Sequence, residues 1–175
     1  MNEEYKPEYS VPARFKNATW EDVPEKIRKC IESMKETRKG IFIHGGVGTG
    51  KTHIAYAIAK QMYGQRMQIE FWNSAELMDA IRRGYDKPFD ETFEDLMKFR
   101  GLLILDDVGS EKLTEWVAER FYLLVNRKYN HMLPVIFTSN FNVEELAGRI
   151  GERVASRLVE MCHIIELTGE DKRLK

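Results

Sequence analysis

The chain has 175 residues, 43% of them hydrophobic and 31% charged, and its 27 basic side chains nearly balance its 28 acidic ones. This length suits one domain with a substantial core, and the balanced charge excludes both a polycation that coats nucleic acid and an acidic disordered tail. Two cysteines without a CxxC pair argue against a disulfide framework and a structural zinc site. No signal-peptide core or membrane-length apolar run is present, which predicts a soluble, cytoplasmic protein without a membrane partner.

An irregular N-terminal segment precedes a regular alternation of apolar patterns. Residues 1–19 carry prolines and alternating charges without periodicity, so we expect an arm or linker there and one core domain over residues 20–175. Helices are expected from Pro24 to a stop at Gly40, over 52–62, from a cap at Asn73 or Ser74 to Gly84, and over 89–99, 114–129, 143–147 and 150–160. Strands are expected over 41–44, 68–72, 102–105, 135–138 and 163–167. Strands that alternate with helices predict an α/β fold, a parallel sheet with helices on both faces.

A glycine-rich loop follows the first expected strand. It matches G-x-x-x-x-G-K-[ST] in full, with the residues Gly45, Gly46, Val47, Gly48, Thr49, Gly50, Lys51 and Thr52. Glycines let successive backbone N–H groups point at phosphates, and the start of the following helix adds a favourable field. Lys51 can contact the β- and γ-phosphates and Thr52 can bind Mg²⁺, so the loop predicts a site for ATP or ADP with Mg²⁺ rather than a solvated glycine-rich turn.

Two histidines flank the loop. We expect structural rather than catalytic roles for the side chains of His44 and His53. Because His53 directly follows the loop, we also expect it among the residues that bind the nucleotide.

Two carboxylates follow the apolar run Leu102–Leu105. Asp106, at the carboxyl end of a buried strand, is the expected Mg²⁺ residue, and Asp107 is placed to activate the attacking water. An acidic turn after a buried strand is the alternative, which the phosphate loop upstream makes less favoured. Many ATPases carry the longer Glu at the second position, so the Asp leaves a binding scaffold with slow turnover open.

A third polar strand end follows residues 135–138. Asn140 is the candidate that senses the γ-phosphate and positions the water, with Ser139 or Thr138 as substitutes. The alternative is that Asn140 is an ordinary asparagine of a strand-to-turn junction.

Three arginines recur later in the chain at a spacing of four residues. Arg149, Arg153 and Arg157 are expected to form one stripe on a helix. Arginine suits an anion on a neighbouring subunit, although a solvated face paired with nearby glutamates is the alternative.

The chain resembles the AAA+ ATPases of the DnaC/DnaI helicase-loader family, which are related to the IstB transposition helpers. The segments that carry the resemblance are GGVGTGKTH, LLILDDVGSEKLTEW, RKYN, VIFTSNFN and RIGERVASRLVEM, and it extends over about residues 14–173. It implies an ASCE/AAA+ P-loop fold, a three-layer sandwich with a five-stranded parallel sheet and little or no C-terminal lid. It also implies an ATP-dependent oligomer that binds single-stranded DNA and a hexameric replicative helicase.

The resemblance also implies roles for three late arginines. Arg153 is expected to be the arginine finger that acts on a neighbouring subunit, with Arg157 beside it, and Arg173 is expected to face the nucleotide. Loaders of this kind usually carry a helicase-docking domain ahead of the core, whereas only about twenty residues precede Trp20 here. The chain is therefore either a natural short form or a piece of a longer protein.

Four residues form the expected contact to single-stranded DNA: Trp72, Arg82, Arg83 and Lys87. Aromatic rings stack on bases and cations follow phosphates, but a core position for Trp72 and a solvated helix end for the arginines remain the alternative reading.

The leading function is an ATP-driven helicase loader in DNA replication, and the first alternative is an IstB-like transposition helper ATPase. A small-molecule P-loop kinase is less favoured, because the tandem carboxylates and the late arginines fit an ATPase better.

Overall fold

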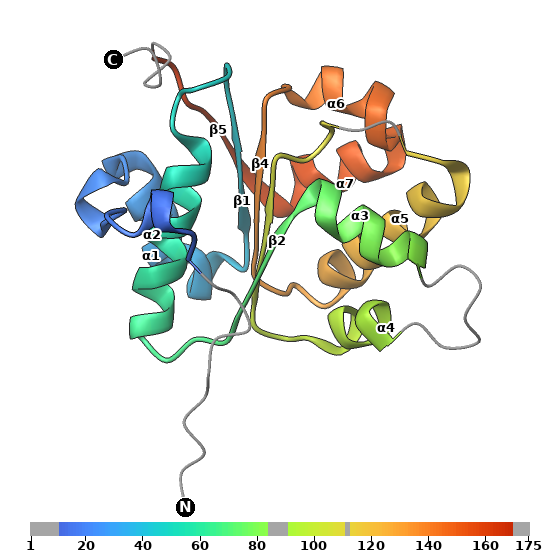
Figure 1. The fold of residues 1–175 in the computed structure, drawn as a ribbon, viewed down its shortest axis with the longest axis horizontal. Coiled ribbons are helices and arrows are strands. Elements are labelled where there is room, and N and C mark those ends of the chain that lie inside the picture. Colours follow the sequence, from blue (N-terminus) through green and yellow to red (C-terminus); the bar gives the residue numbers. More distant parts are fainter. Residues whose placement is uncertain (1–10, 84–90, 111–112, 170–175) are drawn as a thin grey trace, which may run out of the picture.

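The computed structural model describes residues 11–83, 91–110 and 113–169. Within them, five strands form one parallel sheet in the order β2-β3-β4-β1-β5 (Figure 1). The strands are β1 (Gly40–His44), β2 (Ile69–Asn73), β3 (Leu102–Asp106), β4 (Val135–Ser139) and β5 (Cys162–Glu166). The expected five-stranded parallel sheet is confirmed.

Helices cover both faces of the sheet (Figure 1). One face is covered by α1 (Glu25–Thr37) and α2 (Lys51–Gly64), and the other by α3 (Ser74–Arg83), α4 (Glu91–Lys98), α5 (Glu115–Asn130), α6 (Val143–Ile150) and α7 (Glu152–Met161). Short 3-10 turns occupy Ala13–Phe15 and Trp20–Asp22. The three-layer arrangement follows from the strand sequences, because a strand that is apolar throughout can bury both of its faces.

The interior strand β3 shows how the two layers share the sheet. Leu102 and Ile104 pack in the cluster under α1 and α2, whereas Leu103 and Leu105 pack in the cluster under α3–α7. All of them are at most 1% exposed, so the carboxylate that ends this strand is held on a rigid support.

The end of α1 differs from the sequence prediction. The helix stops at Thr37, and Arg38 adopts the left-handed conformation with φ of 57° while its N–H donates to Met34 O. Gly40, expected as the terminator, is instead the first residue of β1, where a Cβ atom would lie 2.5 Å from Val135 O. The glycine is required for close approach of two strands rather than for ending a helix.

The described part of the expected arm, residues 11–19, packs against α2. The Phe15 ring stacks on Tyr56 with centroids 4.8 Å apart, and Ala18 is fully buried. Lys60 of α2 donates to Lys16 O at 2.8 Å and to Ala18 O at 2.7 Å. This segment is therefore fixed along the middle of α2.

Among the described residues, no helix has the length and apolar character needed to cross a bilayer.

Candidate functional site

The carboxyl ends of β1, β3 and β4 and the loops that follow them border a cavity of about 650 Å³. In open parallel sheets, ligands bind at the carboxyl ends of the strands, in the crevice between neighbouring strands whose following helices cover opposite faces of the sheet. The strand order places β4 between β1 and β3, so the ends of these three strands meet at one cavity. Its lining includes Val47, Gly48, Gly50, Lys51, Thr52, His53, Asp106, Asp107, Thr138 and Asn140.

The loop after β1 has the backbone that a phosphate site needs. Gly50, the N-cap residue of α2, has φ of 95°, and Gly45 has φ of 151°. A Cβ atom on Gly45 would lie 2.1 Å from Leu167 O, because the segment after β5 runs alongside the loop and Leu167 N donates to His44 O at 2.7 Å. Glycine is therefore dictated at both positions, and the first N–H groups of α2 face the cavity as an anion site.

The Lys51 ammonium lies over this loop. Its Nζ donates to Gly45 O and Gly46 O at 2.7 Å each, and the residue is only 6% exposed. The loop is braced by Thr49, whose hydroxyl donates to Gly46 O at 2.9 Å. A single positive charge is thus held above the backbone N–H groups, where it can neutralise phosphate oxygens.

Asp106 forms the floor of the cavity with two threonines. The Thr52 hydroxyl donates to its Oδ2 at 3.0 Å and the Thr138 hydroxyl donates to its Oδ1 at 2.6 Å. Burial raises the pKa of Asp106, the two hydroxyl bonds oppose that rise, and the neighbouring charge of Asp107 adds to it. A hydroxyl and a carboxylate in contact are oxygen donors of the kind that Mg²⁺ prefers, and a site that uses one carboxylate together with phosphates is common for this ion. The residues present therefore fit the expected metal.

Asp107 is oriented by residues of β4 and its end. Its backbone N–H donates to the Thr138 hydroxyl at 2.9 Å, and the Asn140 Nδ2 donates to its Oδ1 at 2.7 Å. Its φ of 59° lies in the left-handed region, which Asp tolerates better than most residues. The expected water-activating carboxylate and the expected sensor amide are therefore in direct contact.

Three residues that sequence analysis did not assign also line the cavity: Arg14, Phe15 and Asn73. Arg14 and Phe15 lie in a segment without periodicity, so no pattern marked them. Asn73 was noted only as a helix cap, and its Oδ1 does accept from Ala75 N at 3.0 Å.

The His53 side chain is engaged elsewhere. Its Nε2 lies 2.9 Å from Asp22 Oδ2, and this hydrogen bond is the main cause that lowers the pKa of Asp22. This contact fits the structural role expected for the ring, while His53 itself borders the cavity.

A family model described as "IstB-like ATP binding protein" matches residues 15–175. The chain belongs to the IstB-like ATP-binding family. The glycine loop, Lys51 and Asp106 lie within the matched range, and nucleotide binding is the property that the family name states.

The relatives of this IstB-like protein include both replication and insertion-sequence proteins. The replicative helicase loader DnaI of Bacillus subtilis (strain 168) is 29% identical over 161 residues, which cover 82% of this chain and 51% of DnaI. The insertion sequence IS5376 putative ATP-binding protein of Geobacillus stearothermophilus is 28% identical over 156 residues, which cover 86% of this chain and 62% of that protein. This chain thus spans about half to three fifths of these curated relatives.

A crystal structure of the DnaC helicase loader has the same fold. The TM-score is 0.79 at 26% sequence identity, over 89% of this chain and 99% of that one. The fold is therefore that of an AAA+ P-loop domain.

The arginine stripe of the IstB-like chain is divided between two helices, so the prediction of one stripe on one helix is wrong. Gly151, with φ of 95°, separates α6 from α7. Arg149 belongs to α6, lies 3.8 Å from the Phe141 ring centroid and donates to Gly109 O at 3.1 Å. Arg153 and Arg157 lie on α7 and contact Tyr122 of α5.

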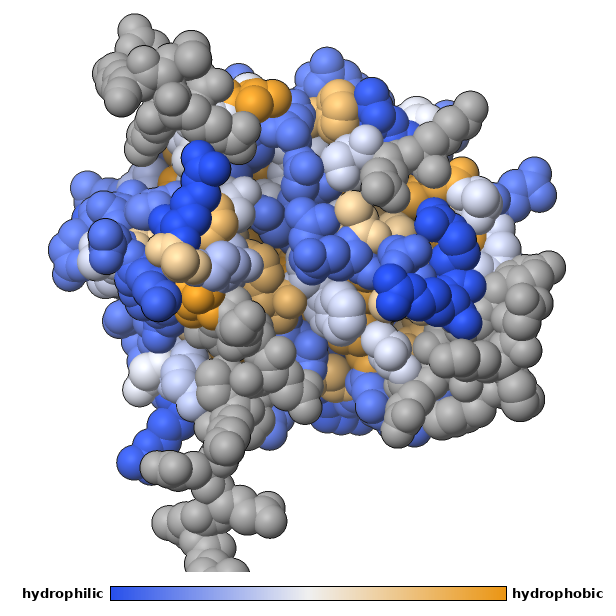
Figure 2. All heavy atoms as spheres, in the orientation of Figure 1, coloured by the Kyte–Doolittle hydropathy of each residue, from blue (hydrophilic) through white to orange (hydrophobic). Residues whose placement is uncertain are grey.

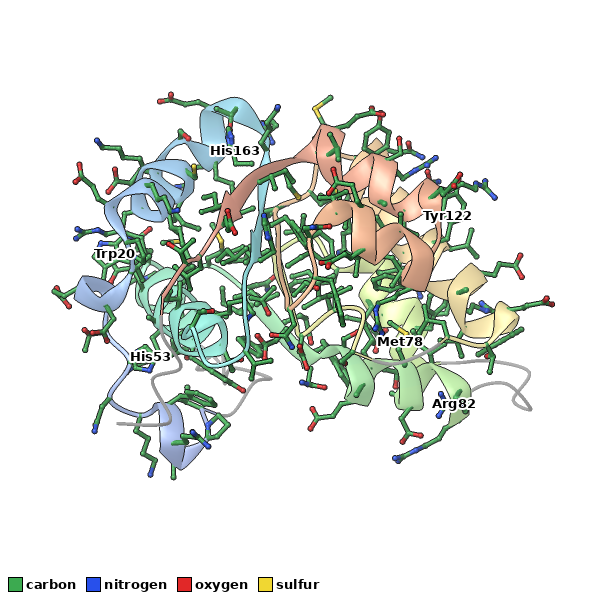
Figure 3. All side chains as sticks on the ribbon, turned by 90° about the horizontal axis from the view of Figure 1, so that it is seen from above. Trp20, His53, Met78, Arg82, Tyr122 and His163 are labelled. Carbon is green, nitrogen blue, oxygen red and sulfur yellow. The ribbon has the colours of Figure 1, made fainter. Side chains whose placement is uncertain are left out.

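The α7 arginines lie far from the cavity of their own chain, which neither of them lines. Figure 3 shows Tyr122 on the side of the molecule opposite His53, which marks the start of α2. Arg173, the third late arginine, lies outside the described residues.

The candidate DNA contacts are partly engaged within the chain. Trp72 is half-buried against the α3–α7 layer, and its Nε1 donates to Glu70 Oε2 at 3.0 Å. Arg82 lies 3.6 Å from Asp79, and Arg83 pairs with the same carboxylate. A strongly hydrophilic patch lies over α3 in Figure 2. Lys87 lies outside the described residues.

Proposed function

We propose that this protein is an ATPase that hydrolyses ATP at a site completed by a second copy of the chain, and that it acts as a helicase loader in DNA replication. The observation that carries the ATPase proposal is the contact between Asn140 and Asp107 above the Thr52–Asp106 pair. A site that only binds nucleotide has no need for a second oriented carboxylate, whereas hydrolysis requires a group that accepts a proton from water.

Each residue of the cavity has a defined task in this proposal. The loop N–H groups and Lys51 bind the phosphates, and Thr52 with Asp106 would hold Mg²⁺, which supplies charge neutralisation when bound. Asp107 accepts the proton of the attacking water, and the Asn140 amide keeps the carboxylate directed into the cavity. Because the Asn140 amide also reaches the cavity, it can exchange its bond to Asp107 for one to the γ-phosphate.

The arginine that completes the site is Arg153 of a neighbouring copy. Arg153 is exposed and lies against Tyr122, which Figure 3 shows on the side of the molecule opposite His53 and the start of α2. It therefore cannot serve the cavity of its own chain. An arginine that stabilises charge on the γ-phosphate in trans accelerates phosphoryl transfer by about 10³–10⁵-fold in other systems. Arg173 is proposed to face the nucleotide within its own chain.

Single-stranded DNA is the proposed nucleic-acid ligand, with the end of α3 as its contact. Arg82 and Arg83 share one carboxylate, so the group keeps a net positive charge for backbone phosphates. Trp72, at the other end of α3, is proposed to stack on a base with its half-buried ring, and Lys87 is proposed to extend the contact.

The experiment that tests the ATPase proposal combines sizing with phosphate release. The protein is sized by light scattering with a non-hydrolysable ATP analogue, with ADP and without nucleotide, each with and without single-stranded DNA. Assembly that requires the ATP analogue, together with phosphate release that needs no small-molecule acceptor, supports the proposal. A monomer under all conditions, or phosphate transfer to a small molecule, contradicts it.

A transposition helper is the second candidate, since an IS5376 protein is nearly as similar as DnaI. Two assays separate these functions. A loader binds the replicative helicase and increases its unwinding of DNA with a single-stranded gap. A transposition helper assembles on duplex DNA and stimulates a transposase, and that result with no helicase binding would contradict the loader.

A further inference from the structure

α5 and α7 meet in a small polar cluster on the side of the molecule away from the nucleotide cavity (Figure 3). We name it the Tyr122 cluster, and its members are Tyr122, Asn126, Arg153 and Arg157. Tyr122 and Asn126 lie one helical turn apart on α5, and the two arginines lie one turn apart on α7, so all four side chains meet at one contact between helices.

Arg157 is fixed within this cluster. Its Nε donates to Asn126 Oδ1 at 2.8 Å, one terminal nitrogen donates to the Tyr122 hydroxyl at 2.9 Å, and the other donates to Arg153 O at 3.1 Å. The side chain is half-buried. An arginine that uses all three nitrogens inside its own chain is poorly suited to reach another molecule.

Arg153 has the opposite character. It is exposed, its guanidinium carbon lies 4.0 Å from the centroid of the Tyr122 ring, and it forms no ion pair with a described residue. A cation–π contact at an exposed position is weak and leaves the N–H donors at the guanidinium edge available. Arg153 is therefore the member that can bind an anion while it stays in contact with the ring.

Neither arginine of the cluster forms an ion pair with a described carboxylate, although Glu119 and Glu152 line the hollow beside Arg153. The acceptors that bind Arg157 are an amide, a phenol and a backbone carbonyl, all uncharged. Glu160, one turn further along α7, accepts instead from the Tyr129 hydroxyl at 2.5 Å. Two guanidiniums share one tyrosine ring, since Arg157 lies 4.8 Å from the same centroid. An arginine without an ion-pair partner is suited to bind an anion such as the terminal phosphates of ATP.

A hollow of about 470 Å³ beside Arg153 leaves room for a neighbour. Its lining includes Tyr122, Gly151 and Val154 together with the carboxylates Glu119 and Glu152. Gly151 has no heavy atom within 4 Å of the place where a Cβ would lie, apart from its own chain neighbours. The Tyr122 cluster is thus accessible from outside on the side where Arg153 is exposed.

We propose that Tyr122 is a positioning residue for Arg153, which it presents to the ATP site of an adjacent copy, and that Arg157 and Asn126 fix the Tyr122 ring for this purpose. This inference rests on the proposed function, in which Arg153 acts in trans. The ring restricts the guanidinium to the surface of α5, and the bond from Arg157 to the hydroxyl fixes the ring. Without the ring, the long Arg153 side chain samples many rotamers, and little of its population has the reactive geometry.

The test uses a mixture in which donor and receiver of the arginine are different variants. Lys51→Ala subunits cannot bind ATP but carry an intact Arg153, and Arg153→Ala subunits bind ATP but lack the arginine. Their mixture should hydrolyse ATP at the interface where Arg153 of a Lys51→Ala subunit faces the ATP-bound cavity of an Arg153→Ala subunit. Tyr122→Leu is then placed in the donor or, separately, in the receiver, and turnover is measured at saturating ATP with assembly followed by light scattering.

We expect Tyr122→Leu in the donor to lower the turnover of the mixture by about 10–100-fold, the loss that follows from misplacing a reacting group, and to have little effect in the receiver. Tyr122→Phe, which keeps the ring, should restore most of the activity in the donor. Tyr129→Leu is the matched control, because it removes the next tyrosine of α5, which contacts Arg157 at 5.4 Å and not Arg153. Thermal denaturation of each variant shows whether it folds.

Each result has a defined meaning. Full activity with Tyr122→Leu in the donor, or an equal loss in donor and receiver, overturns the positioning role while the trans arrangement stands. A mixture of Lys51→Ala and Arg153→Ala that stays inactive although the two co-assemble overturns the trans role of Arg153, and the role of Tyr122 with it.

Discussion

The Thr138 hydroxyl holds both carboxylates of the site, and its removal should have a measurable cost. It donates to Asp106 Oδ1 at 2.6 Å and accepts from the Asp107 N–H at 2.9 Å, and the residue is 1% exposed. Thr138→Val keeps the shape of the side chain and removes both bonds. The bond to a charged acceptor contributes about 2 kcal/mol and the bond from the amide about 1 kcal/mol. We therefore expect the variant to unfold with a free energy about 3 kcal/mol below that of the parent.

The assay is thermal or urea denaturation without nucleotide. For a chain of this size, a loss of about 3 kcal/mol corresponds to a fall in Tm of roughly 6–12 °C. Thr138→Ser is the control, since it keeps the hydroxyl and loses only a methyl group, which costs about 1 kcal/mol. If Thr138→Val proves as stable as Thr138→Ser, the two hydrogen bonds do not contribute as argued, and the rigidity of the Asp106–Asp107 pair must come from another source.

Three further predictions concern single side chains. Lys51→Ala should abolish nucleotide binding in a direct titration, and an unchanged affinity would contradict the assignment of the phosphate loop. Asp107→Asn should keep ATP binding but slow single-turnover hydrolysis by about 10²–10⁴-fold, because an amide cannot accept the proton of the water; unchanged turnover would mean that another group activates it. Lys128 is fully buried, donates to Phe99 O, and has its pKa lowered to about 8, chiefly by burial. The unfolded chain therefore binds the proton more tightly, and the free energy of unfolding should gain up to about 1.4 kcal/mol per pH unit from this group between pH 8 and its usual pKa near 10.5. Lys128→Met should remove this part of the slope in denaturation series across that range, and an identical slope in both proteins would contradict the pKa assignment.

Local patterns predicted most of the fold because they have local causes. The run Leu102–Leu105 is apolar at every position because both of its faces are buried, and this pattern alone places the strand. The phosphate loop and the two carboxylates were found because their spacing along the chain is fixed by the chemistry of phosphate and metal. Their meeting with Asn140 follows from parallel topology, since the carboxyl ends of parallel strands share one edge of the sheet.

The features that sequence analysis missed depend on contacts between distant segments. Gly40 is required by Val135 of another strand, and nothing in its own neighbourhood distinguishes it from a helix terminator. The spacing of Arg149, Arg153 and Arg157 is helical, but Gly151 interrupts the helix between them. Tyr122 carries no local motif at all, and its contact with the α7 arginines exists only because α5 and α7 pack together.

The attachment of residues 11–19 to α2 has a mechanical consequence. Two bonds from Lys60 and the stacking of Phe15 on Tyr56 bind this segment to the helix whose first turn carries the phosphate loop. Val11 and Phe15 both pack against the core under α1 and α2, and Arg14 and Phe15 line the candidate nucleotide cavity. Tension applied at residue 11 would therefore act on one wall of this cavity. A pull on this segment would thus change the shape of the candidate nucleotide site before it disturbed the strands.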